Sequence, residues 1–266
     1  MTNTKPVHFF DITSTLPGAY KSWSPNTLKV RAVLNFKSIP YTQSWVSYPD
    51  IAPLMKGFGV EPNKVGHAYT LPAIVHESIL DHQGAMMDSL PIVEHLDHVF
   101  PDRPLFPSGD ASYALFLAVN KLTLALGPAV RTLIIPSVPE HLDPRGQEYF
   151  VRTRSESFGK PLAEVRPTDE GEIAEMWETM EKGCETLIKM LKGREGKKGP
   201  FFEGETASYA DLSFACLLAF FHRFDREIWE KFMGLGDGEF RALWDATLPW
   251  LEGQGEEKEW PIPQDA

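Results

Sequence analysis

Val7-His8-Phe9-Phe10-Asp11-Ile12 opens the stretch that decides the fold. This short apolar run predicts a β-strand, and from Pro25 onward the apolar residues recur at helical spacing. Residues 41–48 are rich in aromatic and β-branched side chains and predict a second strand. Because a helix between two strands is the usual crossover between parallel neighbours, the two strands are expected to be parallel. The helix also carries basic residues, which are expected away from its apolar face: Lys29, Arg31 and Lys37.

The next part of the chain predicts the rest of a small sheet. The connection 51–68 is rich in Pro and Gly and predicts irregular chain with room for one short helix. Two apolar runs, 71–75 and 78–81, predict a pair of strands joined by a tight turn, and 88–99 predicts a helix. This order of elements is typical of a small mixed sheet with helices on its faces, the thioredoxin-like arrangement.

Beyond a proline-rich linker the strand signals stop. Residues 136–168, rich in Pro and charge, predict an extended connection or insertion. Helices are predicted at 112–134, 169–192, 208–222, 225–233 and 239–251. The chain is therefore predicted to have a thioredoxin-like α/β domain at 1–104 and an all-helical domain at 110–266.

The composition narrows the choice of function. A chain of 266 residues, 42% of them hydrophobic, can bury a substantial core. A formal net charge of -11 argues against nucleic acid as a partner, since phosphate binding needs clustered Lys and Arg. No apolar run reaches membrane-spanning length. Cys184 and Cys216 are the two cysteines, too few for a disulfide framework. With no signal-peptide pattern at the start, a cytoplasmic protein is expected.

Ser24 is the first candidate for a chemical role. It lies where the turn after the first strand ends, and Pro25 then occupies the helical position at which a missing N–H costs nothing. A helix N-terminus has unpaired N–H groups and partial positive charge, so it can lower the pKa of a thiol from about 8.5 into the neutral range. A hydroxyl that donates to the sulfur adds to this effect. The alternative is that Ser24 merely caps the helix, as serine usually does there.

Asn26 and Thr27 lie in the same first turn. Their side chains either point at the same anion or hydrogen-bond back to the helix. The back-bond is the favoured interpretation for Thr27, and both interpretations stay open for Asn26.

Leu71-Pro72 stands directly before a strand-like run. A proline in this place can adopt the cis form and turn the polar backbone groups of the preceding residue outward, where a bound peptide can pair with them. The alternative is an ordinary proline at the start of a strand.

Asp88-Ser89 opens a predicted helix. Ser89 can offer its hydroxyl and its N–H to a carboxylate at a positive helix end, and Asp88 can accept from an ammonium group. The alternative is a helix cap with an acidic first turn, which satisfies the same backbone groups without a ligand.

Two further patterns have structural explanations. Ser208 and Asp211 have the spacing of a capping box and predict a buried helix, with no catalytic role. His95 and His98 are three residues apart on a predicted helix, but no further set of ligands accompanies them, so no metal is predicted.

In this order the motifs resemble those of cytosolic glutathione transferases of the serine type, over the whole chain. The resemblance implies a thioredoxin-like domain that binds glutathione and a helical domain that contributes a hydrophobic site for the second substrate. Ser24 is then the activating hydroxyl, with Asn26 as its catalytic neighbour. The residues implied to bind glutathione are Thr27, Lys64, Leu71, Pro72, Asp88 and Ser89.

Within that resemblance each part of glutathione has its own partners. Pro72 matches the cis-proline that pairs with the cysteinyl part, and Asp88-Ser89 matches the pair that holds the γ-glutamyl end. For the glycyl carboxylate, Lys64 and His67 are candidates in the long connection 51–68. By analogy the family implies a homodimer.

The stretch 24–27 together with 45–51 is also similar to the fungal etherase-related class, kin to bacterial enzymes that cleave aryl ethers with glutathione. Members that work by thiol–disulfide exchange carry Cys where this chain has Ser24. The resemblance therefore implies attack by a glutathione thiolate on a hydrophobic electrophile or a peroxide. A binding protein for aromatic compounds with little turnover is the alternative, and a purely structural module is a third.

Overall fold

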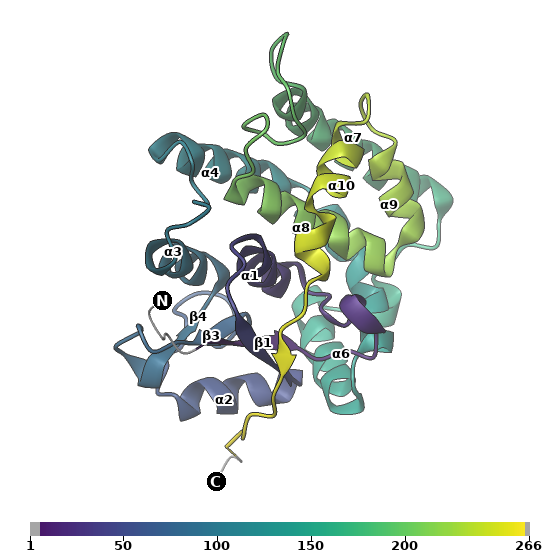
Figure 1. The fold of residues 1–266 in the computed structure, drawn as a ribbon. Helices are drawn as coiled ribbons and strands as arrows, with labels where there is room; N and C mark the ends of the chain where they lie inside the picture. Colours follow the sequence, from purple (N-terminus) through teal and green to yellow (C-terminus); the bar gives the residue numbers. More distant parts are fainter. Residues whose placement is uncertain (1–5, 264–266) are drawn as a thin grey trace. The chain divides into compact units, whose positions relative to one another are not determined.

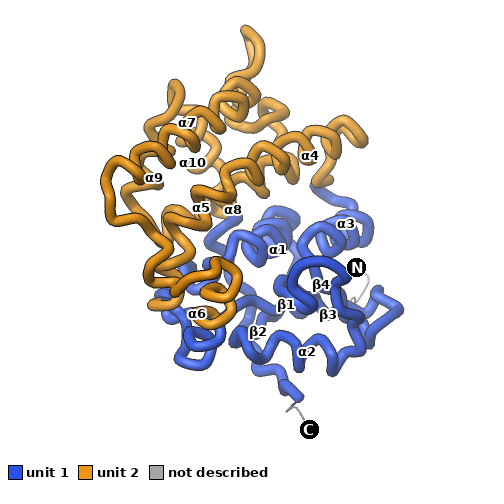
Figure 2. Tube along the Cα trace, turned by 180° about the vertical axis from the view of Figure 1, so that it is seen from behind, with its two compact units in different colours: residues 1–103, 141–149, 250–266 blue, residues 104–140, 150–249 orange. Residues whose placement is uncertain are grey.

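The structure is a computed structural model and describes residues 6–263. It divides into two compact units, distinguished by colour in Figure 2. The first unit contains the chain up to residue 103, the segment 141–149 and the chain from residue 250 onward. The second contains residues 104–140 and 150–249. Two segments from beyond residue 104 therefore pack with the amino-terminal unit.

The first unit is built on a five-stranded mixed sheet with the order β4-β3-β1-β2-β5. β1 runs parallel to β2 and antiparallel to β3, and β3 runs antiparallel to β4. Every residue of the central strand β1 is buried, because helices cover both faces of the sheet. The strands are β1 (Val7–Ile12), β2 (Tyr41–Val46), β3 (Ala73–Val75), β4 (Ala85–Met87) and β5 (Glu256–Glu257).

Helices α1 (Pro25–Phe36) and α3 (Ser89–Val99) lie side by side on one face of this sheet, and α2 (Ile51–Gly57) lies on the other (Figure 1). The side chain of Lys37, fully buried, joins α1 to α3 through a 2.6 Å contact with Asp97. The expected parallel pair and the short helix after β2 are confirmed. Short 3-10 turns, η1 (Gly18–Lys21) and η2 (Tyr48–Asp50), complete the loops after β1 and β2.

Two of the three basic residues expected away from the apolar face of α1 are buried. Arg31 is 0% exposed and Lys37 is 7% exposed. Both side chains are surrounded by oxygen acceptors, which offset the cost of burying a charge. Helical periodicity identifies an apolar face, but it does not reveal a polar network inside the fold.

The predicted strand at 78–81 is also wrong. The partner of β3 is β4, with Ala73 opposite Met87, and residues 78–81 belong to the loop between these strands. Leu80 is 95% exposed there, so the apolar run that indicated a strand is not part of the core. The loop turns back at Gly84, whose φ of +85° suits a residue without a Cβ, before β4 begins.

The second unit is helical throughout its described length, apart from short turns and bridges. The predicted helix at 112–134 is two helices, α4 (Asp110–Ala125) and α5 (Gly127–Ile134). The prediction of an extended connection at 136–168 is wrong, because most of this segment is helical. It contains η4 (Ile135–His141), α6 (Pro144–Phe158) and η5 (Leu162–Glu164). Buried side chains such as Phe150 anchor this segment despite its high polarity.

The remaining helices agree closely with the sequence. They are α7 (Glu170–Lys192), α8 (Tyr209–Phe224), α9 (Arg226–Met233) and α10 (Glu239–Glu252). α8 is the centre of the unit, with twelve buried residues. At its start Asp211 accepts a hydrogen bond from the backbone N–H of Ser208 at 2.8 Å, as a capping box requires, and a second from the N–H of Phe202 at 2.7 Å. The thioredoxin-like sheet and the all-helical part together confirm the predicted fold class.

No single helix within residues 6–263 has the length and apolarity needed to cross a membrane. One pair, 110–125 with 127–141, meets that criterion only when its two members are joined across a 50° bend, and only by length and composition.

Candidate functional site

Ser24 lies at the N-terminus of α1, as the sequence predicted. Its extended backbone (φ -67°, ψ 127°) precedes Pro25, and its carbonyl oxygen accepts the first helical hydrogen bond, from Leu28 N–H at 2.9 Å. The Ser24 side chain makes no capping hydrogen bond with the helix. The residue is 6% exposed. Ser24 is therefore the cap in its backbone only, and the helix does not consume its hydroxyl.

The two residues that follow differ in where their side chains point. Thr27 is 0% exposed, and its hydroxyl donates to the carbonyl oxygen of Ser24 at 3.2 Å. This is the back-bond that the sequence favoured. Asn26 is exposed, and its side-chain oxygen accepts from the ammonium group of Lys29 at 3.3 Å.

The peptide bond between Leu71 and Pro72 is cis. Pro72 directly precedes β3, and its carbonyl oxygen accepts a hydrogen bond from Asp88 N–H at 3.1 Å. β3 begins with Ala73, which pairs with Phe10 near the end of β1. The cis bond thus lies at the same end of the sheet as the exit of β1 toward α1.

Asp88 joins this arrangement from the end of β4. Its φ of 75° is a left-handed conformation that non-glycine residues rarely adopt, and its carboxylate accepts a 2.6 Å hydrogen bond from the hydroxyl of Thr70. Strain of this kind persists where the surroundings fix the residue, and it often accompanies a binding role. Ser89 is the first residue of α3, so its N–H belongs to an open helix end.

The sheet register brings the three motifs to the same end of the sheet. β1 leaves the sheet at Ile12 on its way to Ser24, β3 enters it after Pro72, and β4 leaves it before Asp88. Two helix N-termini therefore begin at the same end of the sheet as a cis-proline. Open helix ends favour negative charge, and a strand edge offers backbone partners to a peptide.

The basic candidates lie in a loop whose neighbouring residues Glu61 and Asn63 line the same cavity as Asp88. Lys64 and His67 are exposed in the loop between α2 and β3. That loop is closed by a 2.8 Å hydrogen bond from Asn63 N–H to the carbonyl oxygen of Ala68. Within residues 6–263, no hydrogen bond or ion pair joins Lys64 to Ser24 or to Asp88.

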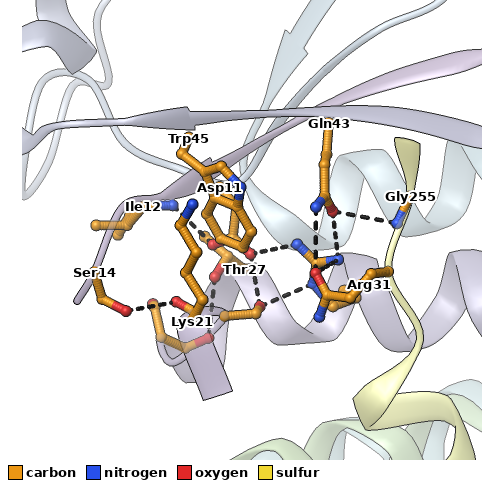
Figure 3. A network of polar contacts seen from close by, with 12 residues as sticks. Asp11, Ile12, Ser14, Lys21, Thr27, Arg31, Gln43, Trp45 and Gly255 are labelled. Carbon is orange, nitrogen blue, oxygen red and sulfur yellow. Dashed lines mark hydrogen bonds and ion pairs between the residues drawn. The ribbon is translucent and has the colours of Figure 1, made fainter. Parts of the chain in front are cut away.

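The sequence did not reveal a buried polar network around Arg31, which Figure 3 shows with Asp11 and Gln43. Arg31 donates to a carboxylate oxygen of Asp11 at 2.8 Å and to the hydroxyl of Ser22 at 2.9 Å. The available signal was an arginine seven positions after Ser24, which places both on one side of the helix. Basic residues on helices are usually solvated, so the pattern alone did not favour burial.

One of the two histidines weighed as a metal site, His95, has another partner. His95 Nε2 lies 3.1 Å from the hydroxyl of Ser78, which also contacts His76. Burial lowers the pKa of His76 and of His95 below the ordinary value of 6.5. The part of the chain that the structure describes contains no group of three or more His, Cys, Asp or Glu placed to hold a metal ion.

The fold, with two helix N-termini and a cis-proline at one end of the sheet, is that of the glutathione transferase architecture. The family model described as "Glutathione S-transferase, N-terminal domain" matches residues 23–99, and the one described as "Glutathione S-transferase, C-terminal domain" matches residues 114–250. A curated relative in Aspergillus flavus, the glutathione S-transferase-like protein ustS, is 57% identical, with 99% of this chain and 97% of the relative covered. The chain belongs to the glutathione S-transferase family.

Solved structures agree with this assignment. A glutathione S-transferase of Ceriporiopsis subvermispora, in complex with glutathione, is 33% identical with a TM-score of 0.80, covering 92% of this chain and 98% of that one. Glutathione transferase GSTFuA3 from Phanerochaete chrysosporium is 28% identical with a TM-score of 0.81, covering 93% and 98%. The β-etherase LigF from Sphingobium, 14% identical with a TM-score of 0.57 over 91% and 94% of the two chains, shares the fold alone.

Proposed function

We propose that this protein is a serine-type glutathione transferase in which Ser24 stabilises the thiolate of glutathione. The observation that carries the proposal is the hydroxyl of Ser24, left unused by α1 at an open helix end. In this role Ser24 keeps its proton and donates a hydrogen bond to the sulfur. The helix N-terminus adds its partial positive charge, and both effects favour the ionised thiol.

The rest of glutathione would then bind along the end of the sheet where β3 begins and β4 ends. Its cysteinyl backbone pairs with Leu71 beside the cis bond, and its γ-glutamyl group meets Asp88 and Ser89. Asp88 suits the ammonium group, whereas the hydroxyl and N–H of Ser89 suit the carboxylate. The presence of glutathione in the similar Ceriporiopsis structure supports this choice of ligand.

The reaction is attack by the thiolate on an electrophile. When the target is a carbon that bears a leaving group, a carbon–sulfur bond forms, and the leaving group departs with the bonding electron pair and takes a proton from solvent. The thiol proton is released to water when glutathione binds. Such a reaction needs position and a stabilised nucleophile rather than a metal-bound step.

The decisive test compares Ser24→Ala with the native protein. We expect kcat/KM toward an aromatic electrophile to fall by about 10- to 100-fold, because a hydrogen bond to a charged group contributes about 1.5–3 kcal/mol. Affinity for reduced glutathione, measured by calorimetry, should change by less than about threefold, because most of the peptide contacts remain. Ser157→Ala, which removes a serine hydroxyl exposed on α6, is the matched control. Equal activity of Ser24→Ala and native protein would refute the serine-type assignment.

The class of electrophile is tested separately. We propose hydrophobic and aromatic electrophiles, with β-aryl ether cleavage and peroxide reduction as the specific reactions to examine. A panel of aryl ethers, isothiocyanates and hydroperoxides, followed by loss of free thiol, distinguishes among them. If aromatic compounds bind but no member of the panel is turned over, the protein is a binding protein instead.

We further propose a cytoplasmic homodimer, by analogy with the family. Light scattering on the purified protein tests the dimer, and microscopy of the tagged full chain tests the location.

A further inference from the structure

Arg31 occupies a special place on the helix that begins at Ser24. Arg31 comes seven positions after Ser24, which is close to two full turns, so the two lie on the same side of α1. The Arg31 side chain is 0% exposed and is paired with the equally buried Asp11 of β1. A buried charge pair of this kind fixes α1 against the sheet, because removing either partner leaves the other charge uncompensated.

The same guanidinium holds the turn that leads into Ser24. Its Nε donates to the hydroxyl of Ser22 at 2.9 Å, and that hydroxyl donates to Asp11 at 2.6 Å. Arg31, Ser22 and Asp11 thus form a closed triangle. One residue earlier, the carbonyl oxygen of Lys21 accepts a 2.9 Å hydrogen bond from Ser14 (Figure 3). The turn is therefore fixed at Lys21 and Ser22, within three residues of Ser24.

The remaining donor group of Arg31 faces the carboxyl-terminal segment. Nη1 donates to the side-chain oxygen of Gln43 at 2.7 Å and to that of Gln254 at 3.0 Å, and it lies 3.4 Å from the carbonyl oxygen of Gly253. Gln43 also donates to Gln254 at 3.2 Å. Gln254 is itself exposed, so it closes the network on the solvent side.

The chain that follows is held to the sheet independently of Arg31. β5 pairs with β2 through Thr42 and Gln43, and Lys258 N–H donates to the carbonyl oxygen of Gln43 at 2.8 Å. Trp260 packs against Phe10 with ring centroids 5.3 Å apart. Residues 253–255 and residues 256–263 therefore have separable tasks.

We propose that Arg31, Ser22 and Gln254 are positioning residues for Ser24, and that the carboxyl-terminal segment 253–255 completes this assembly. The inference rests on the proposed function of Ser24, and it assigns to residues distant in the sequence the task of holding its hydroxyl in place. None of the three touches the reacting atoms. They act through the backbone of the turn and through the orientation of α1.

Small displacements matter at such a site. A hydrogen bond to a reacting sulfur weakens steeply with distance and angle, and a misplacement of about 1 Å can cost about 100-fold in rate. Loss of Gly253 and Gln254 would admit water to Arg31 and replace two fixed acceptors with mobile ones. Nη1 of Arg31 then keeps only the Tyr41 hydroxyl and the Gln43 side-chain oxygen as fixed acceptors, so the guanidinium that holds Ser22 is less firmly placed.

A comparison of two truncated chains tests the proposal. A chain that ends at Gly255 keeps every acceptor of Arg31 and loses β5 and Trp260, whereas a chain that ends at Glu252 loses both sets. We expect kcat/KM with glutathione to stay within about twofold of the full chain in the first and to fall about tenfold in the second. The pKa of the bound thiol, read from thiolate absorbance against pH, should rise only in the second.

Point variants cover the case in which the shorter chain does not fold. Gln254→Ala should raise the thiol pKa and lower kcat more than it changes KM, whereas Glu259→Ala, in the exposed tail outside the network, should change neither. Hydrogen exchange over residues 14–24 should rise in Gln254→Ala alone. A change in thermal stability without a change in thiol pKa or exchange overturns the proposal.

The two levels of inference fail in different ways. If the native protein lowers no thiol pKa and turns over no electrophile, the proposed function is lost, and the positioning of a catalytic Ser24 is lost with it. If the native protein is active and Gln254→Ala matches it in thiol pKa and in exchange over residues 14–24, only the positioning role is lost.

Discussion

The hydroxyl of Thr70 lies 2.6 Å from a carboxylate oxygen of Asp88 and donates a hydrogen bond to it. The two residues come from opposite sides of a β-hairpin, one just before the cis bond at Pro72 and the other just after β4. Their contact joins the strand edge proposed for the cysteinyl backbone to the helix end proposed for the γ-glutamyl group. It also holds Asp88 in its left-handed conformation.

We predict that Thr70→Val weakens glutathione binding without changing the chemical step. Loss of the hydroxyl leaves the Asp88 carboxylate unsupported, and a hydrogen bond to a charged group contributes about 1.5–3 kcal/mol. The expected result is a rise in KM for glutathione of about tenfold with kcat nearly unchanged. Steady-state kinetics with varied glutathione measures both values, and Thr132→Ala on α5 is the control. A fall in kcat with constant KM would contradict this role.

We predict that Ser24→Cys creates a reactive thiol. The new side chain would stand at the N-terminus of α1, where the helix dipole lowers a thiol pKa. Rapid alkylation by iodoacetamide near neutral pH is expected, as is a mixed disulfide with glutathione disulfide. Mass spectrometry locates the modified residue.

The native cysteines supply the internal control for that variant. Both are buried, and burial raises the pKa of Cys184 to about 12. The native protein should therefore resist alkylation while folded. Slow alkylation of Ser24→Cys, no faster than that of the native cysteines, would show that the turn lacks the expected electrostatic character.

We predict that the protein loses stability as the pH is lowered, because of His8. Burial lowers the pKa of this histidine from 6.5 to about 4, and its ring nitrogens contact Thr42 at 2.6 Å and Ser44 at 2.9 Å. The unfolded chain takes up the proton first, so stability is complete above pH 6.5 and declines as the pH falls toward 4. The full change is about 3 kcal/mol.

Denaturant unfolding between pH 4 and 8 measures this dependence. His8→Gln removes the titrating group and should flatten the curve. Some slope should persist, since burial also lowers the pKa of His222 to about 4. An unchanged slope in His8→Gln would show that other groups control the acid response.

We predict that Asp211→Ala destabilises the helical unit by about 2–4 kcal/mol. The buried carboxylate accepts from Phe202 N–H, Ser208 N–H and the hydroxyl of Ser208, so its removal leaves buried donors without partners. Burial raises the pKa of Asp211 to about 6, and Asp211→Asn, which keeps an acceptor oxygen, should cost less. Thermal unfolding compares the two. Equal losses would indicate that the charge, rather than the hydrogen bonds, matters.

Local sequence patterns predicted much of the fold. Apolar runs located β1 and β2, and helical periodicity located α1, α3 and α7 to α10 within a few residues. These signals are reliable because each element is long enough to repeat its own period several times. The run at 78–81 wrongly predicted a strand, because four residues are too few to distinguish a strand from an exposed loop.

The candidate site was partly visible in the same way. The local backbone signals were Ser24 with Pro25, Leu71 with Pro72, and Asp88. The structure places all of them at the same end of the sheet. The contact between Thr70 and Asp88 could not be read from the sequence, because it depends on how the β3–β4 hairpin closes. The catalytic roles themselves remain predictions for the experiments above.

The sequence by itself determined which segments are strands and helices, where two helices begin, and which family the motifs resemble, because these properties are written in neighbouring residues. Only the tertiary structure decided that Arg31 is buried and that Gln254 completes its partners. The physical reason is that a buried charge needs several acceptors at once. Here they come from Asp11, Gln43 and Gln254, which only the folded sheet and its fifth strand bring together.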